Sequence, residues 1–145
     1  MSEARDRQDV LAAHEGYLRA NTDIDPVALR DVWDSDPSNV WFNLSGHTYQ
    51  GLAHWSMLWD YYRTRIKSAR PWTAINPEVR VVGDAAWVTC LRESEMVWVG
   101  QGPAPMRMGP GQSRSTMLFI RQGGSWKAVH AHFSTASEAP RPGGI

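Results

Sequence analysis

The residue whose chemistry stands out in this sequence is Arg92, which lies in an apolar run that predicts a strand. Every second residue shares its face, and these neighbours are small or apolar: Ala86, Val88, Cys90, Ser94, Met96 and Trp98. A buried arginine is costly unless something pairs with it. Two interpretations follow. Arg92 holds a carboxylate, enolate or phenolate oxygen of a ligand in a pocket, or it forms a structural salt bridge, for example with Glu15 or Asp60.

Two histidines, His130 and His132, alternate with apolar residues and therefore share one face of a second predicted strand. Such a pair could bind a metal, but no third ligand stands at a suitable spacing, so we expect no metal site. Structural hydrogen bonding is the default role of both. His130 is a candidate general base only if its face lines a pocket, and Tyr17 is the other candidate for proton transfer. No acid–base pair stands out, so the catalytic residues stay unassigned.

Aromatic residues recur at helical spacing over 51–67, where the stripe consists of Leu52, Trp55, Trp59, Tyr62 and Ile66. Such a stripe usually packs in a core, but aromatic walls also suit a flat hydrophobic ligand. His14, on the apolar face of an earlier helical segment, could lie at the mouth of the same pocket.

The elements that must position these residues are three helices followed by strands. The helices are expected over 3–20, from Pro26 to about Trp33, and over 51–67, with Asp25 as an N-cap. A strand over 40–44 precedes the third helix. Four more strands are expected over 79–82, 85–99, 113–121 and 126–134, with a loop over 100–112 and a three-residue turn at 122–124. This order predicts an α+β fold with the helices on one face of an antiparallel sheet. Residues 1–136 would form a single domain and 137–145 a flexible tail.

Composition narrows the classes of function. The chain has 145 residues, 42% of them hydrophobic, and its 15 basic side chains balance 15 acidic ones. A balanced charge argues against a nucleic-acid or membrane-surface partner. No apolar run is long enough to span a membrane, the charged N-terminus does not resemble a signal peptide, and Cys90 is the sole cysteine, so we expect a cytoplasmic protein.

Two segments suggest a family. The run from Ala74 to Arg92, with its Gly83-Asp84 turn, and the closing run from Gly123 through Trp126, His130 and His132 to Ser134 resemble the association domain of calcium/calmodulin-dependent kinase II. The helix order agrees with the wider nuclear-transport-factor-2-like superfamily, which includes SnoaL-like cyclases, ketosteroid isomerase and limonene epoxide hydrolase. The resemblance implies a cone-shaped, cystatin-like barrel with a deep pocket, and usually a homodimer.

The resemblance also indicates how this pocket differs. Of three pocket arginines in the kinase association domain, only the one matching Arg92 is present, and the other two positions align with Met117 and Phe133. This alignment implies that the side chains of Met117 and Phe133 point into the pocket. Because neighbouring residues of a strand face opposite sides, His130 and His132 would then point away from it. The sequence Arg92-Glu93-Ser94 lacks the carboxylate that would match limonene epoxide hydrolase, and no equivalent of the isomerase aspartate can be placed.

The function expected from these features is small-molecule binding in an aromatic-lined internal pocket, with no cofactor. The ligand would be hydrophobic and carry one anionic or carbonyl group. The residues expected to contact it are Arg92, Trp55, Trp59, Tyr62, Ser94, Met96, Met117, Phe133 and His14. The alternatives are an isomerase, cyclase or dehydratase acting on such a ligand, and a purely structural association domain. A homodimer is expected through the sheet face that carries Trp87, Leu91 and Val97, and the loop with Met106 and Met108 is interpreted as a linker rather than a lid.

Overall fold

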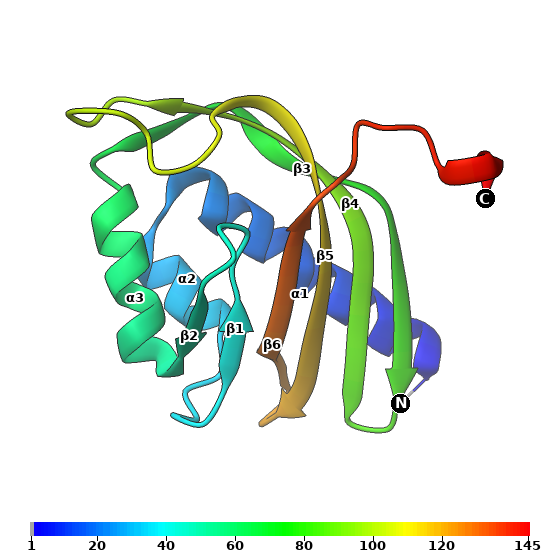
Figure 1. The fold of residues 1–145 in the computed structure, drawn as a ribbon. Coiled ribbons are helices and arrows are strands. Elements are labelled where there is room, and N and C mark those ends of the chain that lie inside the picture. Colours follow the sequence, from blue (N-terminus) through cyan, green and yellow to red (C-terminus); the bar gives the residue numbers. More distant parts are fainter. Residues whose placement is uncertain (1) are drawn as a thin grey trace.

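The computed structural model, which describes residues 2–145, is an α+β protein in which helices pack on one face of a bent six-stranded sheet (Figure 1). The helices are α1 (Glu3–Asp23), α2 (Pro26–Val32) and α3 (Gly51–Tyr62), and a 3-10 turn, η1, covers Pro142–Gly144. The strands are β1 (Val40–Phe42), β2 (Thr48–Gln50), β3 (Ile66–Val82), β4 (Ala85–Trp98), β5 (Gly109–Gln122) and β6 (Ser125–Thr135). The expected α+β class and helix order are confirmed.

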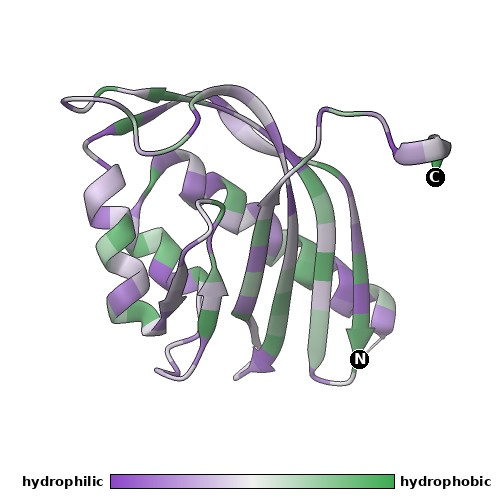
Figure 2. Ribbon diagram, in the orientation of Figure 1, coloured by the Kyte–Doolittle hydropathy of each residue, from purple (hydrophilic) through white to green (hydrophobic). Residues whose placement is uncertain are grey.

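The sheet has the order β2-β1-β6-β5-β4-β3 and does not close into a barrel. All neighbouring strands are antiparallel except β1 and β6, so the expectation of a wholly antiparallel sheet was wrong at this pair. Parallel neighbours need a long crossover, and here most of the chain lies between the two strands. Hydrophobic and hydrophilic residues alternate along β4, β5 and β6, as Figure 2 shows, because one face meets the helices.

Local sequence chemistry sets the helix boundaries. The Ser2 side chain accepts a hydrogen bond from the Arg5 N–H at the start of α1, and Asp25 caps α2 by accepting from the N–H groups of Val27 and Ala28. Asp25 and Pro26 therefore act as expected. The third helix ends at Tyr62, five residues before the predicted end.

Strand β3 is much longer than the expected 79–82 because it begins at Ile66. Pro71 lies in this edge strand, where a missing N–H is tolerated. The register between β3 and β4 shifts between Arg70 and Thr73, so the strand is irregular there. Two hydrogen bonds to Thr22, at the end of α1, hold this part of β3 in place. The Thr22 Oγ1 accepts from the Trp72 N–H at 2.9 Å, and the Thr22 carbonyl accepts from Ser68 Oγ at 2.8 Å.

The hairpin between β5 and β6 differs from the expected three-residue turn. Gln122 pairs with Ser125, so only Gly123 and Gly124 connect the strands, and both have positive φ angles, 53° and 82°. Two consecutive left-handed residues are what a tight hairpin turn requires. A three-residue turn would place His130 opposite Thr116 and His132 opposite Arg114. A register shift after Leu118 adds one residue on β6, so in the structure His130 lies opposite Leu118 and His132 opposite Thr116.

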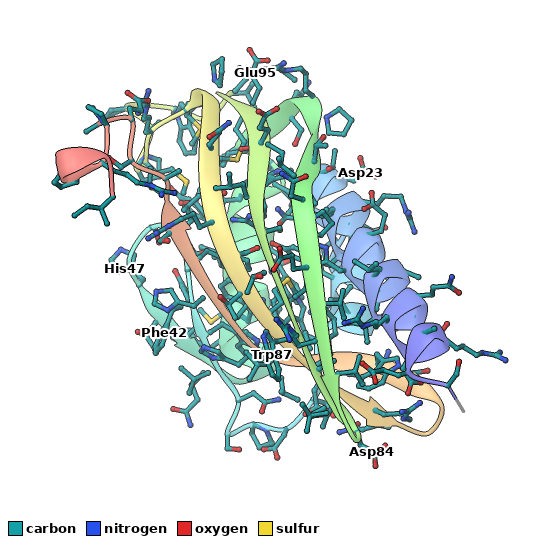
Figure 3. All side chains as sticks on the ribbon, turned by 90° about the vertical axis from the view of Figure 1, so that its right-hand side faces the viewer. Asp23, Phe42, His47, Asp84, Trp87 and Glu95 are labelled. Carbon is teal, nitrogen blue, oxygen red and sulfur yellow. The ribbon has the colours of Figure 1, made fainter. Side chains whose placement is uncertain are left out.

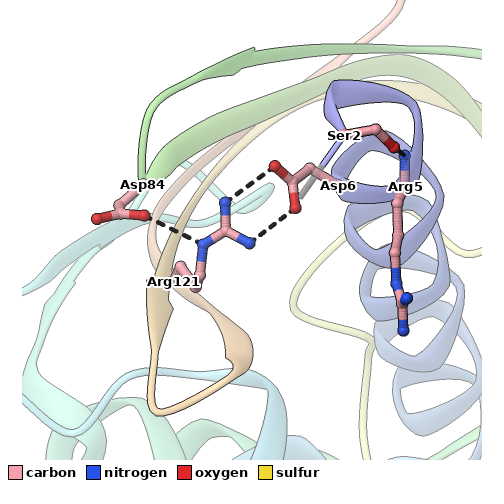
Figure 4. Close-up of polar contacts among 5 residues, drawn as sticks. All are labelled: Ser2, Arg5, Asp6, Asp84 and Arg121. Carbon is pink, nitrogen blue, oxygen red and sulfur yellow. Dashed lines mark hydrogen bonds and ion pairs between the residues drawn. The ribbon is translucent and has the colours of Figure 1, made fainter.

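An ion-pair cluster holds the N-terminal end of α1 against this hairpin (Figure 4). The Arg121 guanidinium donates to both oxygens of Asp6, at 2.7 and 2.9 Å, and to Asp84 at 3.1 Å. It also lies 4.6 Å from the ring of Trp126. The hydrogen bond from Arg121 holds the pKa of Asp6 below its ordinary value.

The core between helices and sheet is dominated by tryptophan. Trp33 packs edge-to-face on Trp41 and on Trp55, with ring centroids 5.5 and 5.7 Å apart, and Trp41 stacks on Trp55 at 5.9 Å. The indole N–H groups of all three are buried without an acceptor among residues 2–145. Trp55 and Trp59 are buried, which confirms that the aromatic stripe of α3 faces inward.

We predict that Trp55→Ala lowers the free energy of unfolding by about 3–5 kcal/mol, because it removes a buried indole and leaves a cavity. Met57→Ala is the matched control, since Met57 is on the same helix but 66% exposed. Urea denaturation followed by circular dichroism measures both. A Trp55→Ala midpoint equal to that of the control would contradict the packing described.

Candidate active site

Arg92 lies on the inner face of β4 and is 2% exposed. Its Nη1 donates to the Tyr17 hydroxyl at 2.9 Å and its Nε to Ser113 Oγ at 3.2 Å. The guanidinium lies between two aromatic rings, 4.3 Å from the centroid of Phe133 and 4.7 Å from that of Trp72. These contacts hold the cation in one place and orientation.

No carboxylate within residues 2–145 pairs with Arg92. Asp60, one of the two partners considered from the sequence, pairs instead with Arg63 on the surface. Nη2 of Arg92 donates no hydrogen bond to the described part of the chain. The structural salt bridge considered from the sequence is therefore absent from the described residues, and donor capacity remains free on the guanidinium.

The ionisable groups around Arg92 are held in their neutral forms. Burial, followed by the positive charge of Arg92, lowers the pKa of His14 to about 4. Burial raises the pKa of the Tyr17 phenol and that of the Cys90 thiol. A neutral imidazole, phenol and thiol supply no negative charge at neutral pH. The positive charge of Arg92 is thus uncompensated by its close neighbours.

A cavity of about 90 Å³ lies beside Arg92, and its wall is formed mostly by aromatic and other apolar side chains. Six residues expected at the ligand site or as catalytic candidates line it: Arg92, Tyr17, Trp55, Trp59, Tyr62 and Phe133. Met96, expected from its place on the Arg92 face, lines it too. The helices α1 and α3, the strands β3, β4 and β6, and the turn between β1 and β2 all contribute to its wall.

Three expected site residues lie outside this cavity. Met117 is fully buried in the core, and Ser94 lines a second hollow instead. His14 is buried with its Nε2 3.9 Å from Cys90 Sγ, which in turn lies 3.3 Å from Ser115 Oγ. His14 therefore supports the wall near Arg92 rather than the mouth of the cavity.

The histidines of β6 are turned away from the cavity. Nδ1 of His130 lies 2.6 Å from the carbonyl oxygen of Val40, and both His130 and His132 contact the Phe42 ring edge-on. Neither lines the cavity. The condition under which His130 was a candidate base is not met, while the default of structural hydrogen bonding agrees with this placement. Residues 2–145 contain no cluster of three or more potential metal ligands.

Sequence reasoning missed several residues of the wall. Trp72 stacks on Arg92, and Asn21, Asn43 and Ser68 bring polar side chains to the cavity. Met106 also lines it, so the loop between β4 and β5 reaches the cavity. Figure 1 shows this loop reaching over the end of α3. The start of β3 is irregular and shows no clear alternation of apolar and polar residues. Only the residue type of Trp72, a tryptophan, could therefore have indicated a place in the pocket.

We predict that His14 makes stability fall with acidification. Its pKa is about 4 in the folded protein against an ordinary 6.5, so between these values the unfolded chain takes up a proton that the folded chain does not. Stability is therefore lost as the pH falls below 6.5. His14→Gln should reduce the loss of unfolding free energy between pH 7.5 and pH 5 by about 2 kcal/mol. Urea denaturation at both pH values measures this change. His47→Gln, at an exposed position, is the control. If both variants show the same pH dependence of the unfolding free energy, His14 is not its source.

Comparison with known proteins supports the fold and gives the family. No curated protein sequence matches this chain. Among solved structures, a ketosteroid isomerase-like protein from Erwinia carotovora atroseptica superposes with a TM-score of 0.76 at 17% identity, covering 94% of this chain and 99% of the other. An NTF2-like protein from Cytophaga hutchinsonii gives a TM-score of 0.74 at 14% identity, covering 94% and 100%.

The CaMKII hub of S. rosetta is 26% identical, with a TM-score of 0.68 and coverage of 90% of this chain and 96% of the hub. The resemblance noted in the sequence is thereby confirmed. No helix within residues 2–145 is long and apolar enough to cross a membrane. The family model of the SnoaL-like domain matches residues 10–138, and the chain therefore belongs to the SnoaL-like domain family.

Proposed function

We propose that this protein binds a small hydrophobic molecule that carries one anionic or carbonyl group, and that Arg92 holds that group. The observation that carries the proposal is a buried guanidinium, without a carboxylate partner in the described chain, in the wall of an aromatic cavity. A buried charge costs several kcal/mol unless it is compensated, and a ligand anion would supply the compensation.

The chemistry of the wall supports a ligand with a single charge. One guanidinium can hold one carboxylate through two parallel hydrogen bonds. Trp55, Trp59 and Phe133 offer aromatic surface for the remainder of the ligand. A polyanion such as a nucleotide would require further cations, and among residues 2–145 Arg92 is the one basic side chain that lines this cavity.

An isomerase, cyclase or dehydratase is the second candidate function, and Tyr17 is the observation that favours it. Its hydroxyl accepts a hydrogen bond from Arg92, and its raised pKa keeps it protonated at neutral pH. Together the phenol O–H and the guanidinium could stabilise an oxyanion that develops on a substrate carbonyl. No carboxylate or histidine of the described chain lines the wall to act as a general base, so binding without chemistry is the first proposal.

Self-association through the outer face of the sheet accompanies this proposal. Trp87 and Leu118 are paired neighbours on that face, and each is 37% exposed. Leu91, Val97 and Phe42 are also exposed there. Figure 3 looks onto this side, with Trp87 and Phe42 labelled. A second copy packed on these residues would remove an apolar surface from water. A cytoplasmic location and a flexible tail at 137–145 stay predictions.

We predict that Arg92→Met weakens binding of benzoate roughly tenfold or more and changes binding of neutral benzamide less than about twofold, because the charged hydrogen bonds are lost and the volume is largely kept. Isothermal titration calorimetry with both probes measures this. Arg80→Met, which removes an exposed arginine from β3, is the control. An equal loss of affinity for both probes would show that the charge does not discriminate between them.

We predict that the protein is a dimer at micromolar concentration and that Trp87→Glu converts it to monomers, because the change places a charge in an apolar contact. Light scattering coupled to size-exclusion chromatography gives the masses. Val27→Glu is the matched control on α2, since Val27 is 73% exposed and lies away from the sheet. A monomeric wild-type protein, or a Trp87→Glu variant that stays dimeric, would refute the assignment of this face.

A further inference from the structure

A second and larger hollow adjoins the Arg92 cavity. It has a volume of about 500 Å³, is open to solvent and is lined by the end of β4, the start of β5, the loop before β5 and the segment after β6. Leu44 and Met96 line both hollows, so these two side chains form the boundary between them. We call this second hollow the vestibule.

Small residues on the inner face of β5 create the vestibule. In the register of the sheet, Gly109 lies opposite Met96, Gly111 opposite Ser94, and Ser113 opposite Arg92. A Cβ atom built on Gly111 would meet no atom within 4 Å, and the φ angle of this residue lies outside the left-handed region. Backbone geometry therefore does not require glycine at 111. The missing side chain leaves room beside Ser94, where an ordinary strand residue would occupy part of the space.

The charged side chains of the vestibule already have partners. Arg70 is paired with Glu95 at 2.7 Å, Arg107 with Glu138 at 3.0 Å, and Glu93 accepts a hydrogen bond from Gln112. The hydroxyl groups of Ser94 and Ser113 also line the wall. The vestibule thus suits a neutral group that forms hydrogen bonds, in contrast to the inner cavity with its free cation.

The inner cavity is too small to hold a ring and a carboxylate together. Its 90 Å³ is less than the roughly 150 Å³ of an engineered cavity that holds benzene. A ligand whose carboxylate reaches Arg92 must therefore extend past Leu44 and Met96. Methionine has a flexible side chain that adapts to such a passage, and Met106 lies at the same cavity.

We propose that the ligand is an elongated aromatic monocarboxylate, with its carboxylate on Arg92, its ring system between Leu44 and Met96, and a neutral hydrogen-bonding end in the vestibule. The proposal rests on the function proposed above and adds the length of the ligand and the polarity of its far end. Gly111 is then a residue that determines specificity through the space it leaves.

Calorimetry with three probes tests this on the full chain. Benzoate is the short probe, 4′-(hydroxymethyl)biphenyl-4-carboxylate the long neutral-ended one, and biphenyl-4,4′-dicarboxylate the long charged one. The long neutral-ended probe should bind the wild-type protein at least tenfold more tightly than benzoate and more tightly than the dicarboxylate. Gly111→Leu should abolish that gain while changing benzoate affinity less than twofold.

Gly16→Leu on α1 is the matched control, because a Cβ atom built there meets only the end of the Arg19 side chain. It should leave the affinities of all probes unchanged. Met108→Trp, which fills the vestibule from the loop, replaces Gly111→Leu if that variant does not fold. If Arg92→Met leaves the affinity for benzoate unchanged, the proposed function is overturned. Benzoate binding that needs Arg92, with no gain for the long neutral-ended probe or with tighter binding of the dicarboxylate, overturns the vestibule proposal alone.

Discussion

The burial of one uncompensated cation, Arg92, is the constraint on which the rest of this structure depends. Removing a guanidinium from water costs several kcal/mol, and no carboxylate of residues 2–145 forms an ion pair with Arg92 to offset this cost. Two aromatic faces and two hydroxyl groups compensate in part. An anionic group of a ligand bound at Arg92 would offset the remaining desolvation cost.

The surrounding fold serves to keep this cation fixed and accessible. Strand β4 carries Arg92 at its inner face, α1 brings Tyr17 to it, and the fastening of β3 by Thr22 places Trp72 over it. The small inward residues of β5 leave the space that begins at Arg92 and widens toward the vestibule. The same helices bury His14, whose lowered pKa keeps a second positive charge out of the site near neutral pH. Stability and function are thus coupled through a few buried polar residues.

The parts of this arrangement that follow a regular period could be predicted from the sequence. Alternation along β4 placed Arg92 on the same face as Ala86 and Val88, and all three are buried. The helical stripe placed Trp55 and Trp59 inside. On β6 the error in the turn and the unforeseen register shift each moved the partners of His130 by one residue. The two displacements add to two residues, and side chains alternate between faces with a period of two. His130 and His132 therefore lie on the face that was expected.

The parts that depend on tertiary context could not be predicted in this way. The helical spacing continued to Ile66 although the helix ends at Tyr62, because a β-strand residue happens to fall at the next helical interval. The start of β3 contains Pro71 and a register shift, so Trp72 had no pattern to reveal it. The parallel pairing of β1 with β6 joins segments far apart in sequence. The vestibule depends on glycines that look like loop residues when no sheet register is known.

The most direct test of the central claim is a crystal structure of the protein with 4-bromobenzoate, using the anomalous signal of bromine to fix the orientation of the probe. We predict carboxylate oxygens within about 3.2 Å of the Arg92 guanidinium and the bromine directed past Met96 toward the vestibule. A bound probe whose carboxylate lies elsewhere, with Arg92 paired to a carboxylate of the protein itself, would contradict it.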